Sequence, residues 1–335
     1  MQRVREVAAG NGELKVEAAI QASGASEPRA AVASEIAQQL DTAGFFILRN
    51  VLDAELIREA DEHVRWLIQK YPDLRPEHLH HPLIRDDAFW VRLVTDSRLL
   101  DIVELLLGPD IACFTAHYIC KPPFDGHPVL WHQDGAYWDL QPMEAVAVWL
   151  AIDETTPQNG CLKMIPGSHR IPLQAPQVTH YPENMLYSRA RDALVAEWSE
   201  RSGVVNVELK PGDISIHHPH ILHCSEANRS SFRRCGLDMG FIKASTQVRN
   251  KGLYLNPLLA RGSPAPGINT YRQWPHYSPQ NTIAFRGFEQ WDATADEHNA
   301  RISSASDLSS STESSIDSTR RMIRRLQEGS VKASE

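Results

Sequence analysis

The stretch VLWHQDGAYWDLQPMEAVAVWLAID, residues 129–153, shows the pattern that decides the fold of this chain. A short apolar run stands at each of its ends, and turn-forming residues separate the two. Comparable runs, bounded by Gly, Pro, Asn or Asp, recur at 111–121, 161–167, 204–209, 213–219 and 234–242. A series of short strands of this kind predicts an antiparallel barrel or sandwich.

Helical patterns precede these strands. One begins near Ala31 and stops at Gly44, and an apolar strand is expected at 45–51. Two further helices are expected at 52–71 and 88–108. Helices followed by strands indicate an α+β fold, in which the N-terminal helices buttress a β core.

Composition suggests three parts for the chain. We expect a flexible arm at 1–28, one domain at 29–285 and a serine-rich mobile tail at 286–335. Nine of the sixteen residues at 303–318 are serine, and such a segment has little apolar surface to bury. The amphipathic stretch TRRMIRRLQ at 319–327 is compatible with a solvated tail or with a partner-binding helix.

Charge and cysteine content exclude several classes of protein. The 42 acidic and 34 basic residues give a net charge of −8, which argues against a nucleic-acid partner. The N-terminus lacks an apolar signal region and the apolar runs are too short to span a bilayer, so we expect a cytoplasmic protein without a membrane partner. The five cysteines are widely spaced without a CxxC, which predicts buried reduced thiols. The sequence carries no signal for the oligomeric state.

His132 and Asp134 are the first candidate metal ligands. Residues two apart on a strand face the same way, so both side chains project together while Gln133 points away. They supply two of the three ligands of a 2-His-1-carboxylate iron(II) site. Candidates for the third are the clustered histidines His217, His218, His220 and His223. The other interpretation is structural, because histidines at strand ends often bond to backbone or water.

Three segments in this order resemble the phytanoyl-CoA dioxygenase family of Fe(II)/2-oxoglutarate oxygenases: HQDGAYW at 132–138, WLAIDETTPQNGCLKMIPGSHR at 149–170, and PGD with HHPHILHCSEANRSSFRR at 211–234. The resemblance covers about 44–242. It implies a double-stranded β-helix (jelly-roll) core at about 111–245 and a lid or substrate segment at about 246–285. It also implies hydroxylation of a C–H bond in a small-molecule metabolite, with Fe(II), 2-oxoglutarate and O2 required and with succinate and CO2 as products.

The resemblance also gives roles to individual residues. It implies that the metal ligands are His132, Asp134 and His223. It places 2-oxoglutarate near four further residues, with the arginine as the anchor of the distal carboxylate: Arg234, Ser225, Lys121 and Trp149. Because Asp134 is kept, hydroxylation is favoured over halogenation, in which a small residue replaces the carboxylate.

Strand alternation separates Arg234 from its neighbour Arg233. Arg233 shares its face with Cys235, Leu237, Met239 and Phe241, which indicates packing. Arg234 shares its face with two glycines and Asp238, which leaves room for a bound dicarboxylate. A guanidinium suits the two-pronged hydrogen bonding of a carboxylate, so Arg234 is the favoured anchor.

Several assignments stay open. Trp149 could wall the co-substrate cavity or serve packing alone, and Lys121 could be a solvated strand-end residue. Tyr137 and Trp138 could line the substrate entrance or simply pack, whereas His169 is interpreted as structural. A zinc-dependent hydrolase and a non-catalytic ligand-binding member of the same fold are the alternative functions.

Overall fold

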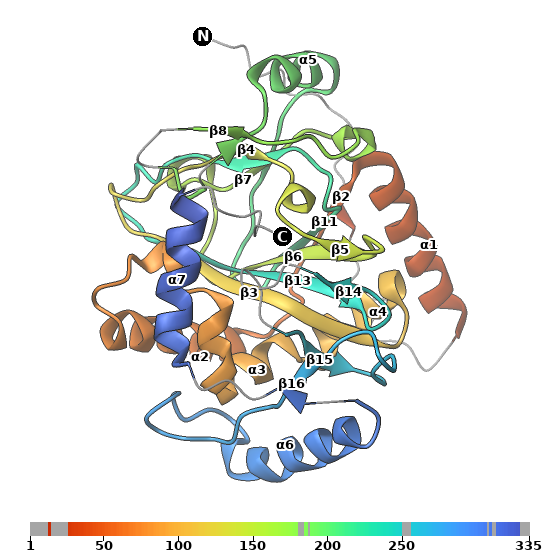
Figure 1. Ribbon diagram of the computed structural model, residues 1–335. Coiled ribbons are helices and arrows are strands. Elements are labelled where there is room, and N and C mark those ends of the chain that lie inside the picture. Colours follow the sequence, from red (N-terminus) through yellow and green to blue (C-terminus); the bar gives the residue numbers. More distant parts are fainter. Residues whose placement is uncertain are drawn as a thin grey trace. The chain divides into compact units, whose positions relative to one another are not determined.

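The computed structural model describes residues 13–14, 26–179, 184–186, 188–249, 256–306, 308–309 and 313–328 (Figure 1). The chain divides into two units, each made of three segments. Unit 1 is Met1–Asp53, Cys120–Trp138 and Ala147–Gly236. Unit 2 is Ala54–Ile119, Asp139–Val146 and Leu237–Glu335. The division falls within three strands: β3 (Ile111–Lys121), β6 (Ala145–Ala151) and β13 (Arg234–Lys243).

The first sheet of unit 1 forms around β2. Helix α1 (Ser26–Ala43) ends at Gly44, whose φ of +82° reverses the chain, and β2 (Phe45–Leu48) follows, as the sequence predicts. Strand β11 (Ile214–His217) pairs antiparallel with β2 on one side and with β6 on the other. Strand β1 (Glu13–Leu14) pairs parallel with β2. The apolar residues of β2 and β6 are buried, which accounts for their continuous hydrophobic pattern.

Asp213 fastens this sheet at the turn before β11. Its buried carboxylate accepts hydrogen bonds from Arg49 Nη1 at 2.8 Å, from Asn50 N at 2.9 Å and from Lys210 N at 2.8 Å. The aspartate of the PGD motif therefore joins the entry of β11 to the end of β2, and its role is structural.

The second sheet of unit 1 is antiparallel, in the order β10 (Val205–Val207), β7 (Leu162–Met164), β12 (His223–Ser225) and β4 (Val129–His132). A β-bulge lies between His223 and Ser225, where the register with β4 shifts. Short elements complete the unit: the 3-10 helices η3 (Asp134–Ala136), η4 (Pro157–Asn159) and η5 (Ser168–Arg170), and the hairpin β8 (Gln177–Val178) and β9 (Ser188–Arg189).

Helix α5 (Asp192–Ser202) was not expected from the sequence. It has no fully buried residue, and its Leu194, Val195 and Trp198 are only half covered by the cluster around Ile165 and Leu222. A helix that contributes so few apolar contacts leaves a weak periodic signal in the sequence.

The helices of unit 2 carry their apolar residues inward. Helix α2 (Ala54–Lys70) buries Leu56, Ala60, Val64 and Leu67, at the spacing that predicted it. Two 3-10 helices follow, η1 (Pro76–His78) and η2 (His81–Asp86). The single helix expected at 88–108 is two helices, α3 (Ala88–Val94) and α4 (Ser97–Leu107). The break lies at Asp96, whose side chain accepts a hydrogen bond from the backbone N–H of Arg98 and caps the second helix.

The strands of unit 2 extend from β3. Strand β15 (Leu258–Arg261) pairs antiparallel with it, followed by β16 (Tyr271–Arg272) and β17 (Leu308–Ser309) in parallel pairing. Strands β14 (Gln247–Val248) and β5 (Leu140–Gln141) form a separate pair. The described part of the expected lid segment at 246–285 thus contains three strands, and its role as a cover over a substrate stays a prediction.

The segment 286–335 differs from the mobile tail that its composition predicts. Helix α6 (Phe288–Ser303) buries Trp291, Ala295 and Ile302. Helix α7 (Ser315–Glu328), dark blue in Figure 1, packs against η2, where Ser315 donates a hydrogen bond to Asp86. The average polarity of the segment concealed α6, because only a few apolar residues hold it, whereas the amphipathic stretch at 319–327 lies within α7. The expected arm at 1–28 lies mostly outside the described residues.

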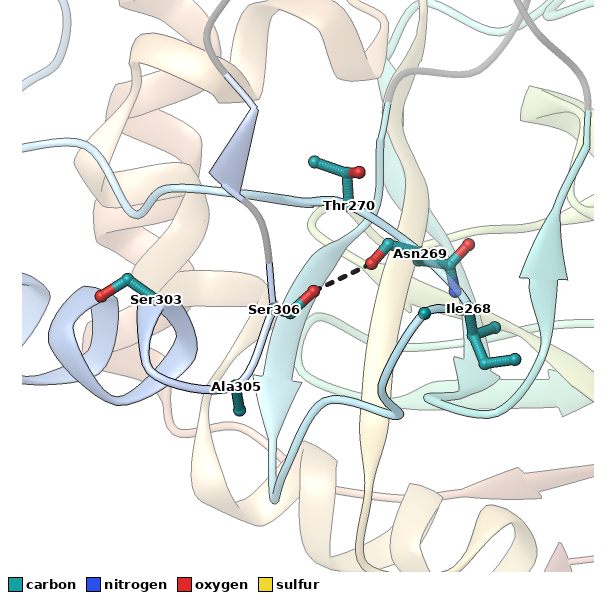
Figure 2. A pocket seen from close by; sticks show the side chains of 7 residues that line it. Ile268, Asn269, Thr270, Ser303, Ala305 and Ser306 are labelled. Atoms are coloured by element: carbon teal, nitrogen blue, oxygen red, sulfur yellow. Dashed lines mark hydrogen bonds between the residues drawn. The ribbon is translucent and has the colours of Figure 1, made fainter.

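A pocket of about 460 Å³ opens in unit 2 between residues 267–270 and 303–306 (Figure 2). Its lining is mainly backbone and small polar side chains, and Ser306 Oγ donates a hydrogen bond to the backbone oxygen of Asn269 at 3.0 Å. None of the site residues expected from the sequence lines it.

The expectation of reduced thiols is wrong for two of the five cysteines. Cys120 and Cys235, both fully buried in unit 1, form a disulfide, while Cys113, Cys161 and Cys224 are free thiols. Pairing could not be predicted because the two residues are 115 positions apart and become neighbours only through strand packing. Among the described residues, every helix is too short or too polar to cross a membrane.

Candidate metal centre

His132 is the last residue of β4, and η3 begins two residues later at Asp134. The two side chains face each other, with Nε2 of His132 at 3.3 Å from Oδ1 of Asp134. Gln133 points away, as alternation predicts: it donates to the backbone oxygen of His220 at 2.8 Å and accepts from the backbone N–H of Gln174 at 3.0 Å. The two hydrogen bonds of Gln133 therefore fix the backbone between His132 and Asp134.

His223 enters the same space from the neighbouring strand. The antiparallel register pairs it directly with His132, and the two imidazole centroids lie 4.1 Å apart. Nε2 of His223 is 3.6 Å from Oδ1 of Asp134. One ligand atom from each of the three residues lies within 4.8 Å of the others, and it is the one such group of three or more His, Cys, Asp or Glu side chains in the part of the chain that the structure describes.

Backbone carbonyls fix the orientation of both imidazoles. Nδ1 of His132 donates to the oxygen of Leu130 at 2.8 Å, and Nδ1 of His223 donates to the oxygen of Ile221 at 3.2 Å. With the proton on Nδ1, each ring turns the lone pair of Nε2 toward Asp134. Metal-binding histidines are held in this way in known sites.

The protonation states also suit a metal. Burial opposes the ionisation of Asp134, but its interactions with His223, His132 and His217 hold the pKa of the carboxyl well below its usual range. Burial, with the neighbouring His132, lowers the pKa of His223 to about 3. At neutral pH the cluster therefore offers a carboxylate and a neutral imidazole, which are the forms that bind a cation. The residues present fit a divalent iron ion.

A fourth histidine, His217, completes the surroundings of Asp134. It ends β11, is buried, and places Nε2 at 3.2 Å from Oδ2 of Asp134. The sequence singled out His217 only as one of four possible third ligands. Its contact with the carboxylate depends on how β11 and β4 pack, which no local pattern reveals.

Arg234 and Arg233 occupy different environments, as the two faces of β13 predict. Arg233 donates two hydrogen bonds to Asp153, at 2.7 and 2.8 Å. The Arg234 side chain is fully buried, and its guanidinium stacks 4.3 Å above the ring of Trp149. The room expected above Gly236 is filled, because a Cβ added there would lie 2.1 Å from the Trp149 indole. Trp149 is therefore the wall against which Arg234 is held.

Lys121 is buried, so the solvated interpretation is wrong. Its ammonium group donates to Ser225 Oγ at 2.8 Å, to the backbone oxygen of Ser225 at 3.2 Å and to that of Glu226. These bonds hold the end of β12, two residues after His223. Asn228 acts nearby in the turn, where it donates to the backbone oxygens of Lys121 and Phe232.

The remaining predicted residues are also buried or bonded. Tyr137 lies with its ring centroid 6.1 Å from that of His132, and its hydroxyl hydrogen-bonds to Ser188 Oγ at 2.8 Å. Trp138 is buried at the end of the same segment. His169 bonds to the backbone oxygen of Asp41 at 2.9 Å and packs on Gly44, in agreement with a structural role.

The sequence of this chain matches a known protein family. The model of the phytanoyl-CoA dioxygenase (PhyH) family matches residues 40–236. This chain belongs to the PhyH family. The match contains all the candidate ligands, and its limits agree with the range of about 44–242 expected from the sequence.

Individual PhyH relatives are distant. The chain is 30% identical to ectoine dioxygenase of Sphingopyxis alaskensis over 188 residues, which is 52% of this chain and 61% of that protein. It is 29% identical to bovine peroxisomal phytanoyl-CoA dioxygenase over 172 residues, 48% of each. The chain thus spans about half to three fifths of the length of these relatives.

Solved structures support the fold. The apo form of the non-heme monooxygenase ThoJ has a TM-score of 0.60 at 20% identity, covering 87% of this chain and 99% of that one. The structure of EctD from S. alaskensis with bound Fe has a TM-score of 0.53 at 23% identity, covering 64% and 77%. Together with the mixed helices and sheets of both units, these likenesses place the chain in the fold of iron/2-oxoglutarate oxygenases.

Proposed function

We propose that this PhyH member is an Fe(II)- and 2-oxoglutarate-dependent dioxygenase that hydroxylates a C–H bond of a small-molecule metabolite in the cytoplasm. The observation that carries the proposal is the convergence of His132, Asp134 and His223, with the Nδ1 atoms of both histidines already bonded to backbone. The two sheets of unit 1, antiparallel except for the pairing of β1 with β2, are consistent with a double-stranded β-helix around these residues.

Each residue of the site has a distinct task in this proposal. His132, Asp134 and His223 hold iron(II) from one side and leave positions for other ligands. Bound iron, with 2-oxoglutarate and O2, supplies the oxidation chemistry, giving succinate and CO2. Asp134 occupies the position that a halogenase would leave open, which favours hydroxylation.

In this proposal Arg234 binds the co-substrate directly and Lys121 contributes indirectly. The buried guanidinium of Arg234 binds the distal carboxylate of 2-oxoglutarate through two parallel hydrogen bonds, and the indole of Trp149 fixes its plane. Lys121 acts through Ser225, because its ammonium keeps the end of β12 in place beneath His223. Tyr137 and Trp138, which follow the ligand pair directly, face the substrate.

Succinate formation tests the proposal. Purified protein loaded with iron(II) without oxygen, then given 2-oxoglutarate, O2 and a metabolite library, should form succinate with at least one compound. His132→Ala, Asp134→Ala and His223→Ala should each lower this turnover at least about 1,000-fold and abolish stoichiometric binding of Mn(II). His276→Gln, at an exposed histidine of unit 2, is the matched control and should change neither property.

Other results would point to the alternative functions. Turnover that requires zinc and neither O2 nor 2-oxoglutarate would indicate a hydrolase. Binding of 2-oxoglutarate without succinate formation for any compound would indicate a non-catalytic member. Wild-type succinate formation by His223→Ala would refute the assignment of the ligands.

A further inference from the structure

The two oxygens of the Asp134 carboxylate have different partners. Oδ1 faces Nε2 of His132 at 3.3 Å and Nε2 of His223 at 3.6 Å. Oδ2 faces away from that pair, toward Nε2 of His217 at 3.2 Å. The carboxylate thus presents one oxygen to the candidate ligands and the other to a residue outside the ligand set.

His217 can only donate to this oxygen, since an ionised carboxylate accepts hydrogen bonds and offers none. The proton therefore lies on Nε2. Nδ1 of His217 is buried and has no hydrogen-bond partner in the structure. The contact between His217 and the carboxylate is therefore made through Nε2 alone.

Strand pairing leaves His217 little freedom to turn away. It stands opposite Ala147 on β6 and opposite Phe45 on β2. The small side chain of Ala147 leaves space for the imidazole on that side of the sheet. The ring also lies 4.8 Å from that of His223, measured between centroids. His217 is thus confined by its pairing with β2 and β6 and by the neighbouring ring of His223.

We infer that His217 is a positioning residue that makes Asp134 a one-oxygen ligand: its Nε2–H holds Oδ2, so that only Oδ1 reaches the metal. The inference rests on the proposed function and deepens it. A carboxylate bound through both oxygens takes an additional coordination position. Holding Oδ2 keeps that position available for the co-substrate or O2.

Metal binding by the purified apoprotein tests this role without any turnover. Loss of an outer hydrogen-bonding partner of a metal ligand typically weakens metal affinity about 10- to 100-fold. His217→Phe removes the donor but keeps a ring, and it should weaken Co(II) and Mn(II) binding in calorimetry by this factor. His217→Gln supplies an amide N–H at similar reach and should restore affinity to within about threefold of wild type.

The visible spectrum of the Co(II)-loaded protein provides a second readout, because it reports coordination number. His217→Phe should change its band positions and intensities, and His217→Gln should retain the wild-type spectrum. His220→Phe, a half-buried histidine three residues later, is the matched control and should match wild type in both measurements. Should His217→Phe fail to fold, as judged by circular dichroism, His217→Leu takes its place.

The outcomes separate the two claims. Equal metal affinity and identical spectra for wild type and His217→Phe would overturn the positioning role while leaving the proposed function standing. Weakened binding in His217→Gln as severe as in His217→Phe would also overturn it, since volume rather than hydrogen bonding would then matter. Absence of stoichiometric metal binding by wild type would overturn both.

Discussion

Arg233 and Arg234 are neighbours in the chain, and we propose that Arg234 alone binds the co-substrate. The two-pronged pair with Asp153 engages Arg233, whereas Arg234 lies fully buried against Trp149 in the unit that holds the ligands. A buried guanidinium whose carboxylate partner is lost costs about 2–5 kcal/mol in binding. The difference between the two arginines can therefore be measured through 2-oxoglutarate itself.

We expect Arg234→Gln to raise the KM for 2-oxoglutarate at least about 30-fold, the equivalent of the lower end of that range. Arg233→Gln should leave this KM within about threefold of wild type and lower only thermal stability. Steady-state kinetics with varied 2-oxoglutarate provide the measurement. A larger KM effect in Arg233→Gln than in Arg234→Gln would show that the anchor has been assigned to the wrong residue.

Single residues also show where sequence reasoning reached its limit. Alternation placed His132 and Asp134 together and separated Arg234 from Arg233, because period two is a property of the strand alone. It could not reveal that Trp149 fills the room above Gly236 or that His217 contacts Asp134. Both facts depend on contacts between strands far apart in the chain.

At the scale of the elements, an aromatic stack within unit 2 holds α6 in place, and the sequence alone does not predict this stack. Trp274 stacks with two rings of α6, with 5.5 Å between its ring centroid and that of Trp291 and 3.8 Å between its centroid and that of His298. Arg301 donates a hydrogen bond to Nδ1 of His298 at 3.1 Å. Burial and the charge of Arg301 lower the pKa of His298 to about 4, so the folded state keeps this ring neutral.

This pKa predicts a dependence of stability on pH. Below the ordinary histidine pKa of 6.5 the unfolded chain binds a proton at His298 that the folded chain does not. Stability should therefore fall as pH decreases from 6.5 to about 4, with about 3 kcal/mol contributed by this residue. His298→Phe keeps the stack and should reduce the loss by that amount, as measured by urea unfolding at several pH values.

The exposed His276 is the control for this experiment, because Asp296 raises its pKa and its effect has the opposite sign. His276→Gln should not reduce the loss of stability at low pH. An unchanged pH dependence in His298→Phe would contradict the buried, neutral state of His298.

Element boundaries followed from the sequence where the signal was local. The end of α1 at Gly44 and the strands β7, β10, β11 and β13 lie where turn residues and alternation predict them. The break between α3 and α4 was missed because apolar periodicity continues across Asp96, whose capping bond outweighs it. Helix α6 was missed because composition records average polarity and ignores which few residues are buried, whereas α7 contains the amphipathic stretch recognised at 319–327.

At the scale of the whole molecule, the residues expected to hold iron and 2-oxoglutarate all belong to unit 1, although they come from two separate segments of the chain, Cys120–Trp138 and Ala147–Gly236. Ligand binding should therefore slow amide exchange locally, since it stabilises only the elements that must open for the ligand to leave. We expect Mn(II) with 2-oxoglutarate to protect β4, β11 and β12 in hydrogen–deuterium exchange. Peptides from α6 and α7 should exchange at unchanged rates.

The Asp134→Ala protein is the control and should show no protection on addition of Mn(II). Equal protection of α6 in the wild type would contradict a local effect.

The register between β4 and β12 has a consequence for how the site comes into being. His132 and His223 are 91 positions apart in the chain and meet only as opposite residues of two hydrogen-bonded strands. A slip of one residue would turn one imidazole to the other side of the sheet. Iron therefore cannot gather its ligands from a partly folded chain, as zinc does in small metal-dependent domains. Binding of iron at this site therefore requires that β4 and β12 have already paired in the correct register.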